Sequence, residues 1–186
     1  KFNGDIGNWD MSSATNIEGM FSADYAYTEF NQDISGWDVS NVIQTANNYG
    51  LFYKAKFFNQ PIGVWNTSSM TNMSNMFGGA LAFNQDIGSW NVSNVTTMSA
   101  MFSSATSFNQ PIGSWNVSSV TNMSSMFGGA SSFNQDISAW DINQVTNFTN
   151  FMVGVTLSTV NYDALLIAWD AQGAMSYSGT VNFGLS

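Results

Sequence analysis

The chain reads Phe108-Asn109-Gln110-Pro111-Ile112-Gly113-Ser114-Trp115, and the pattern of this stretch, Phe-Asn-x-x-Ile-x-x-Trp, occurs six times. The copies begin at Phe2, Phe30, Phe58, Phe83, Phe108 and Phe133. A period of about 25 residues, lengthened by three in the first two copies, is typical of solenoids, in which one repeat cannot bury its apolar face alone and stacks on its neighbours. The sequence therefore predicts six stacked repeats, the first truncated at its N-terminal side.

Two local patterns follow each other within a repeat. Ile112, Trp115 and Val117 have the spacing of the strand motif of leucine-rich repeats, which predicts a short strand. The stretch 120–130 then places apolar residues at steps of 3, 4 and 3, which predicts a short helix or 3-10 turn. We expect an α/β solenoid of the leucine-rich-repeat type, with one short strand and one short helix or 3-10 turn in each repeat.

The repeat pattern stops after Met152. Ser158 is a good N-cap for an amphipathic helix over 158–169, whose apolar face would carry Tyr162, Leu165, Leu166 and Trp169. A solenoid needs a cap over its last open edge. We therefore expect two parts, a six-repeat solenoid over 1–154 and a C-terminal helical cap with a closing segment over 155–186.

Composition excludes several functions. The chain has 3 basic and 12 acidic residues and a net charge of −9, so it lacks the basic surface that nucleic-acid binding requires. No apolar run is long enough to span a membrane, and we expect no membrane insertion by this segment. Without His or Cys, a Ser-His or Cys-His nucleophile cannot be built. Paired carboxylates stay open in principle, but we expect no enzyme and no cofactor other than calcium.

Stacking the repeats would align equivalent residues in rows. The Phe, Trp and Met rows are interpreted as core, with a ligand groove as the alternative, because the inward positions of a solenoid must be apolar. The Asn that follows each Phe is interpreted as structural, since such a row can satisfy backbone groups in the turns.

Outward positions of the predicted strands form a polar face that suits hydrogen bonding to a glycan or an extended peptide. Its candidate binding residues are Asp38, Asn66, Ser89, Asn91, Ser93, Ser114, Asn116 and Ser118. The two longer repeats carry three extra residues each, and Tyr25, Tyr27 and Tyr49 gather in these insertions. Insertions of this kind often lie on a binding face. The alternative is a terminal region that has drifted from the consensus.

Carboxylates in the first two repeats suggest a metal site. Asp5, Asp10, Asp33 and Asp38 are candidate ligands for Ca²⁺, which prefers several oxygen ligands. The alternative is that these side chains only stabilise turns, a common role of Asp and Asn.

The residues Phe83-Asn84-Gln85-Asp86-Ile87-Gly88-Ser89-Trp90-Asn91-Val92-Ser93-Asn94-Val95-Thr96, with Met101-Phe102, resemble the BspA-like leucine-rich repeat surface proteins of bacteria. The tail 157–169 is similar to the segment that closes such arrays. The resemblance covers nearly the whole chain; Thr67 in place of Val and the disturbed second repeat depart from it. It implies a secreted or cell-surface protein that acts in adhesion or protein binding, and it assigns no functional residue.

These observations support a non-enzymatic extracellular or cell-surface protein that recognises a protein or glycan through its polar strand face. The alternative is a structural subunit of an extracellular filament, sheath or appendage, which self-associates through the open ends of the solenoid. Open ends that differ from each other make head-to-tail contacts, and these can grow into filaments.

Overall fold

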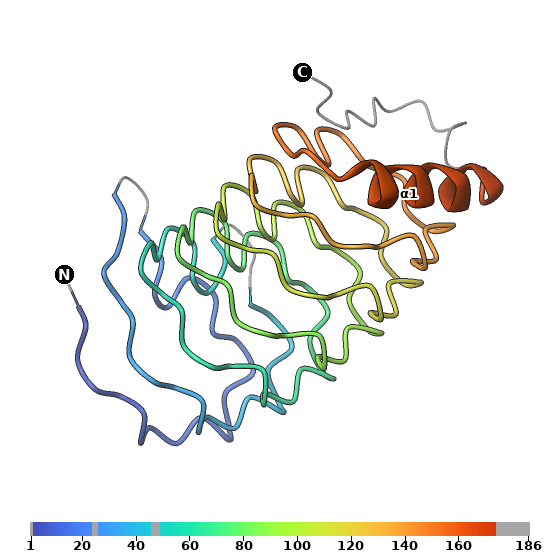
Figure 1. The fold of residues 1–186 in the computed structure, drawn as a ribbon. Helices are drawn as coiled ribbons and strands as arrows, with labels where there is room; N and C mark the ends of the chain where they lie inside the picture. The colour runs from blue at the N-terminus through green and yellow to red at the C-terminus, as the bar shows by residue number, and fades with distance from the viewer. Residues whose placement is uncertain (1, 24–25, 46–48, 174–186) are drawn as a thin grey trace.

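The computed structural model describes residues 2–23, 26–45 and 49–173, and Figure 1 shows a row of similar coils lying side by side. We number the coils 1 to 6 after the six Phe-Asn-x-x-Ile-x-x-Trp copies that begin them. The helix α1 (Thr159–Ala171) follows coil 6 and lies at the end of the row opposite the N-terminus. Within the described ranges no residue belongs to an extended β-strand, and isolated parallel bridges join neighbouring coils instead.

Of the two expectations for this segment, a short helix or a 3-10 turn, the α-helix is not formed in residues 120–130, which make successive turns with bonds to the residue three positions back. Met126 donates its N–H to the carbonyl of Met123, three residues back. The N–H groups of Met123 and Phe127 donate to carbonyls of coil 6 and so cannot make the bonds to residue i−4 that an α-helix requires. Turns of this kind give the same spacing of apolar residues as a helix, which is why the sequence pattern is misleading.

The predicted strand is not formed, and the isolated bridges lie elsewhere in the repeat. The bridges join Asn16 to Gln44, Thr28 to Ala55, Gln44 to Asn72, Asn72 to Thr97, Thr97 to Asn122, and Asn122 to Asn147. The stretch 112–117, where a strand was expected, contains a turn in which the N–H of Trp115 donates to the carbonyl of Ile112 at 3.1 Å. The Trp115 indole N–H instead bonds the previous coil, at the carbonyl of Ile87, 3.2 Å away. In this stretch a side chain therefore links the coils, where a strand would use its backbone.

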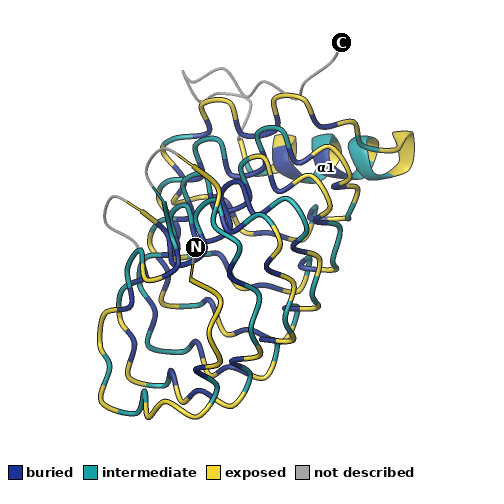
Figure 2. Cartoon of the chain, turned by 90° about the vertical axis from the view of Figure 1, so that its left-hand side faces the viewer, coloured by how far each residue is buried: buried dark blue, intermediate teal, exposed yellow. Residues whose placement is uncertain are grey.

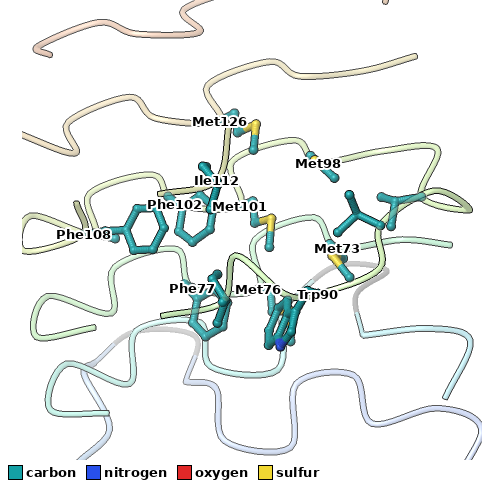
Figure 3. Packing of buried hydrophobic residues seen from close by; sticks show 14 of the residues in the cluster. Met73, Met76, Phe77, Trp90, Met98, Met101, Phe102, Phe108, Ile112 and Met126 are labelled. Carbon is teal, nitrogen blue, oxygen red and sulfur yellow. The ribbon is translucent and has the colours of Figure 1, made fainter. Parts of the chain in front are cut away.

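The core consists of the predicted rows, whose members stack from coil to coil (Figure 3). Phe102 illustrates the packing: the centroid of its ring lies 3.9 Å from that of Phe108, which begins the next coil, and 5.6 Å from that of Phe77 in the coil before. Both contacts have nearly parallel rings. From coil 2 to coil 6 the Phe and Trp rows are buried, so the interpretation of these rows as core is confirmed for these coils.

The Asn row holds neighbouring coils together. The side-chain oxygen of Asn109 accepts the backbone N–H of Asn134, in the next coil, at 2.9 Å. Gln135 donates its side-chain amide to both the carbonyl and the side-chain oxygen of Asn109. The same Asn-to-Asn bond joins every pair of neighbouring coils, with distances of 2.9 Å throughout. The structural role predicted for this row is confirmed.

The helix α1 ends the array by repeating the contacts of a coil. Ser158 is its N-cap, as predicted, and accepts the N–H of Asn161. The backbone N–H of Ser158 donates to the side-chain oxygen of Asn134 at 2.8 Å, the bond that the Asn of a next coil would make. Asn161 donates its side-chain amide to the same two oxygens of Asn134 that a following Gln would bond. Of the predicted apolar face, Leu165 and Trp169 are buried against coil 6, while Tyr162 and Leu166 are only half-buried.

Candidate functional site

The polar residues assigned to a strand face stabilise turns instead. Asn91 accepts both the backbone N–H and the hydroxyl of Ser93 with one side-chain oxygen, at 3.1 and 2.7 Å. Asn66 with Ser68 and Asn116 with Ser118 repeat this arrangement, and Asp38 accepts the N–H of Ser40. Ser89 donates to the carbonyl of Gly63, while Ser114 is exposed. The candidate residues therefore form a row of hydrogen-bonded turns, and the part of the chain that the structure describes forms no flat strand face.

The carboxylates proposed for calcium have the same local role. The four aspartates Asp5, Asp10, Asp33 and Asp38 each accept a backbone N–H from two residues further along the chain. Among the residues that the structure describes, no three acidic side chains come close enough to hold a metal ion. The four carboxylates therefore have the turn-forming role that was the alternative, and calcium binding by them stays a prediction.

Hydrogen bonds to these carboxylates lower their pKa. The hydroxyl and the N–H of Ser40 favour the charged form of Asp38 and lower its pKa, although the charge of Asp10 opposes the shift. The pKa values of Asp10, Asp33 and Asp136 are lowered in the same way by the serine two residues later. A carboxyl whose pKa is lower in the folded chain stabilises the fold above its unfolded pKa of about 4. That stabilisation is lost as the pH falls through the folded value.

The variants Asp38→Asn and Asp38→Ala test this linkage. Asn keeps the turn, as Asn91 does in coil 4, so we expect the stability of Asp38→Asn and of the parent chain to converge only as the pH falls through the lowered pKa of Asp38. At pH 7 the Asn side chain of this variant accepts the same hydrogen bonds without a negative charge. The parent chain should therefore be more stable than Asp38→Asn at this pH. Asp38→Ala should be less stable than the parent at both pH values. Urea unfolding at pH 7 and pH 3 measures the free energy of unfolding of the three chains. If the difference between the parent chain and Asp38→Asn were the same at both pH values, the lowered pKa of Asp38 would not contribute to stability.

A groove of about 180 Å³ lies on the flank of coils 1 to 4 and is the candidate binding site. It is lined by Tyr27, Tyr53, Lys54, Asn75, Gly78, Gly79, Ser103 and Ser104. The rings of Tyr49 and Tyr53 lie 5.7 Å apart, so Tyr49 adjoins the groove. Tyr27 and Tyr49 were candidates from the sequence, and the structure places both of them at or beside this groove, whereas Tyr25 lies outside the described residues.

Two glycines of coil 3 make room for the groove. A Cβ added to Gly78 would lie 3.1 Å from the ring of Tyr53. Gly79 has φ of +72°, a left-handed conformation that favours glycine, and an added Cβ there would lie 3.3 Å from the Lys54 side chain. Lys54 itself has φ of +60°, which places its side chain beside Tyr53, with Nζ 5.1 Å from the ring centroid. The groove is open because Gly78 and Gly79 have no side chains where they face Tyr53 and Lys54 of the neighbouring coil.

A shallow apolar hollow continues the same surface. It is lined by Lys56, Phe57, Leu81, Ala82, Thr106 and Ser107. Half of Phe57 is exposed, and Nζ of Lys56 lies 4.5 Å from its ring centroid. Lys54 and Lys56 are the two basic residues of the described chain, so both stand at this surface.

Sequence reasoning identified only part of this surface. It missed Asn75, Ser103 and Ser104, because these residues occupy ordinary repeat positions and only the stacking brings them beside Tyr27. The glycine pair has the appearance of a helix end. One signal in the sequence could have placed these glycines at the groove. Gly78-Gly79 lies one repeat length after Tyr53-Lys54, so the two pairs occupy equivalent positions on neighbouring coils.

The described helix α1 is too short and too polar to cross a membrane. No curated protein and no solved structure matched the chain. The profile of one protein family, described as "Mycoplasma protein of unknown function, DUF285", matches residues 1–69 and again residues 46–165. Two overlapping matches agree with the internal repetition, and together they cover most of the chain. The chain therefore belongs to the DUF285 family.

Proposed function

We propose that this chain is a non-enzymatic recognition segment of a cell-surface or secreted protein and that it binds a glycan through the tyrosine groove. The observation that carries the proposal is the gathering of Tyr27, Tyr49 and Tyr53 around Lys54 on a surface that is otherwise nearly free of charge. The proposal moves the binding site from the Ser/Asn row to the flank of coils 1 to 4.

The lining of the groove suits a sugar. Exposed tyrosine rings offer apolar faces for the C–H groups of a sugar ring and a hydroxyl for its oxygens. Asn75 and Ser104 add a side-chain amide and a hydroxyl to the lining. A small number of polar groups around an aromatic surface is the usual composition of a ligand site. Lys54 would favour a glycan that carries a carboxylate or sulfate.

The proposal includes the wider assignment from the sequence. We propose a solenoid similar to leucine-rich repeats and related to the BspA-like surface proteins, located outside the cell. The repetitive coils, the low content of charged residues and the absence of His and Cys support a binding role more than catalysis.

The variant Tyr27→Ala tests the groove directly. Tyr27 is 43% exposed, so its removal should leave the fold intact, and we expect the affinity for the bound glycan to fall about tenfold. Val64→Ala is the matched control, because Val64 is 78% exposed in coil 3 but does not line the groove.

The measurement is binding of the purified chain to a glycan array, followed by titration of the best ligand with each variant. Equal affinity of Tyr27→Ala and the parent chain would remove the groove from the proposal. If no glycan bound while a protein partner bound in a Tyr27-dependent way, the site would stand and the ligand class would be wrong.

A further inference from the structure

The apolar hollow beside Phe57 runs along the tyrosine groove on the same three coils. Equivalent positions of coils 2, 3 and 4 line the groove with Lys54, Gly79 and Ser104. The positions two residues further along line the hollow with Lys56, Leu81 and Thr106. Between the two rows stand Ala55, Ala80 and Ala105, which are fully buried. Buried and exposed residues recur in this way on successive coils (Figure 2), so only backbone separates the groove from the hollow.

The groove alone is small for a ligand site. Its volume of about 180 Å³ lies below the roughly 300–1,000 Å³ of most small-molecule sites, and the hollow adds about 340 Å³. A glycan is a chain of similar units, so a second space beside the first suits the next sugar of the same chain. Phe57 is 50% exposed there and offers its ring as Tyr27, 43% exposed, does in the groove. The two spaces together therefore fit at least two sugars.

Two lysines on this surface favour an anionic ligand. The protein has a net charge of −9, yet both basic residues that the structure describes stand here. Nζ of Lys54 lies 5.1 Å from the ring centroid of Tyr53, and Nζ of Lys56 lies 4.5 Å from that of Phe57. An ammonium group therefore lies beside an aromatic ring in the groove and again in the hollow. A sugar with a carboxylate or sulfate gains from both groups, whereas a neutral sugar gains mainly from the ring.

The backbone at Lys54 supports a functional role for this side chain. The equivalent positions of coils 3, 5 and 6 are left-handed glycines, Gly79, Gly129 and Gly154. Coils 2 and 4 have Lys54 and Ser104 there, with φ of +60° and +57°, a conformation that is unfavourable for a residue with a side chain. Both of these residues line the groove. Strained residues of this kind cluster at functional sites.

We infer that the ligand is an acidic glycan of at least two sugars, which places one sugar in the tyrosine groove and the next over Phe57. Its carboxylate or sulfate groups lie at Lys54 and Lys56. This inference rests on the glycan site proposed above, to which it adds a second subsite and a requirement for negative charge.

The first experiment is binding of the purified chain to an array of fragments from disaccharide to hexasaccharide. The acidic fragments are chondroitin sulfate, heparan sulfate, hyaluronan and alginate, and the neutral fragments of equal length are chitin and cellulose. We expect the acidic fragments to bind more tightly, and tetrasaccharides more tightly than disaccharides. The preference for acidic fragments should shrink between about 0.1 M and about 1 M salt, because the Debye length falls from about 10 Å to about 3 Å.

Variants of the hollow then test the second subsite with the best acidic tetrasaccharide. Phe57→Ala should weaken binding about tenfold, as the loss of an aromatic contact does. Lys56→Gln should weaken it about fivefold at about 0.1 M salt and much less at about 1 M salt. Gln144→Glu is the control for charge, because it makes the same change in net charge at an exposed position of coil 6. Val64→Ala is the control for the loss of an exposed apolar side chain.

The outcomes separate this inference from the proposed function. If a glycan bound in a Tyr27-dependent way and neither Phe57→Ala nor Lys56→Gln weakened it, the groove would stand and the second subsite would be wrong. Neutral fragments that bound as tightly as acidic ones of equal length would overturn the charge requirement alone. Absence of binding to every fragment would overturn both proposals. Losses in Phe57→Ala and Lys56→Gln, with neither control affected, support the inference.

Discussion

Replacing Phe102 with alanine is expected to lower the free energy of unfolding by about 3–5 kcal/mol, the usual cost of removing a buried aromatic ring. Phe102 is fully buried in coil 4, and its ring contacts Phe77, Phe108 and Phe127, with centroid distances of 3.9 to 5.7 Å. The stack passes through this position, so the vacated space adjoins three rings that cannot collapse into it without leaving their own neighbours.

Urea unfolding followed by circular dichroism measures the loss. Phe57→Ala is the control, because it removes the same side chain from a half-exposed position and should cost less than about 1 kcal/mol. Similar losses in the two variants would mean that the stacked rows contribute no more to stability than surface rings do.

The variant Trp169→Ala is expected to cost a similar amount, about 3–5 kcal/mol, although it lies outside the repeats. Trp169 is 1% exposed and its ring lies 5.4 Å from Phe148 and 5.6 Å from Phe151, so it closes the last layer of the core. Its removal loosens α1, which also holds the polar edge of coil 6 through Ser158 and Asn161.

The control is Ile167→Ala on the same helix, where the side chain is 73% exposed. We expect the urea midpoint of Ile167→Ala to be close to that of the parent chain and the urea midpoint of Trp169→Ala to be lower. If both variants unfolded together with the parent chain, α1 would be an appendage and the array would be stable without it.

The stacked rows and the capping helix could be predicted from the sequence, because each depends on residue type at a fixed spacing. Every repeat has a Trp at the position of Trp115, and so large an apolar side chain is expected in the core. Ser158 precedes the apolar face of a helix, which predicts the N-cap. The local backbone could not be predicted in the same way. The steps from Met123 to Phe127 fit a helix and a series of turns equally well, and the choice depends on hydrogen bonds to the neighbouring coil, a full repeat away in the sequence.

The candidate site was harder to predict for a related reason. Asn91 and Asp38 were assigned outward positions, but a side chain that faces solvent can still be fully engaged with its own turn. Tyr27 was selected because it stands in an insertion, yet its partners Gly79 and Ser104 come from coils 3 and 4. Residues that meet only through stacking carry no common signal in the sequence.

The Asn-to-Asn bond has a consequence for how such a chain can change in length. Every junction between coils uses the same donor and the same acceptor, always one repeat apart. A whole repeat can therefore be gained or lost by recombination between its copies, and the two new neighbours still fit. A deletion of a few residues within coil 4 or 5 would instead misalign the polar row with the aromatic rows. Selection should accordingly tolerate a change in the number of repeats far more readily than a deletion inside one.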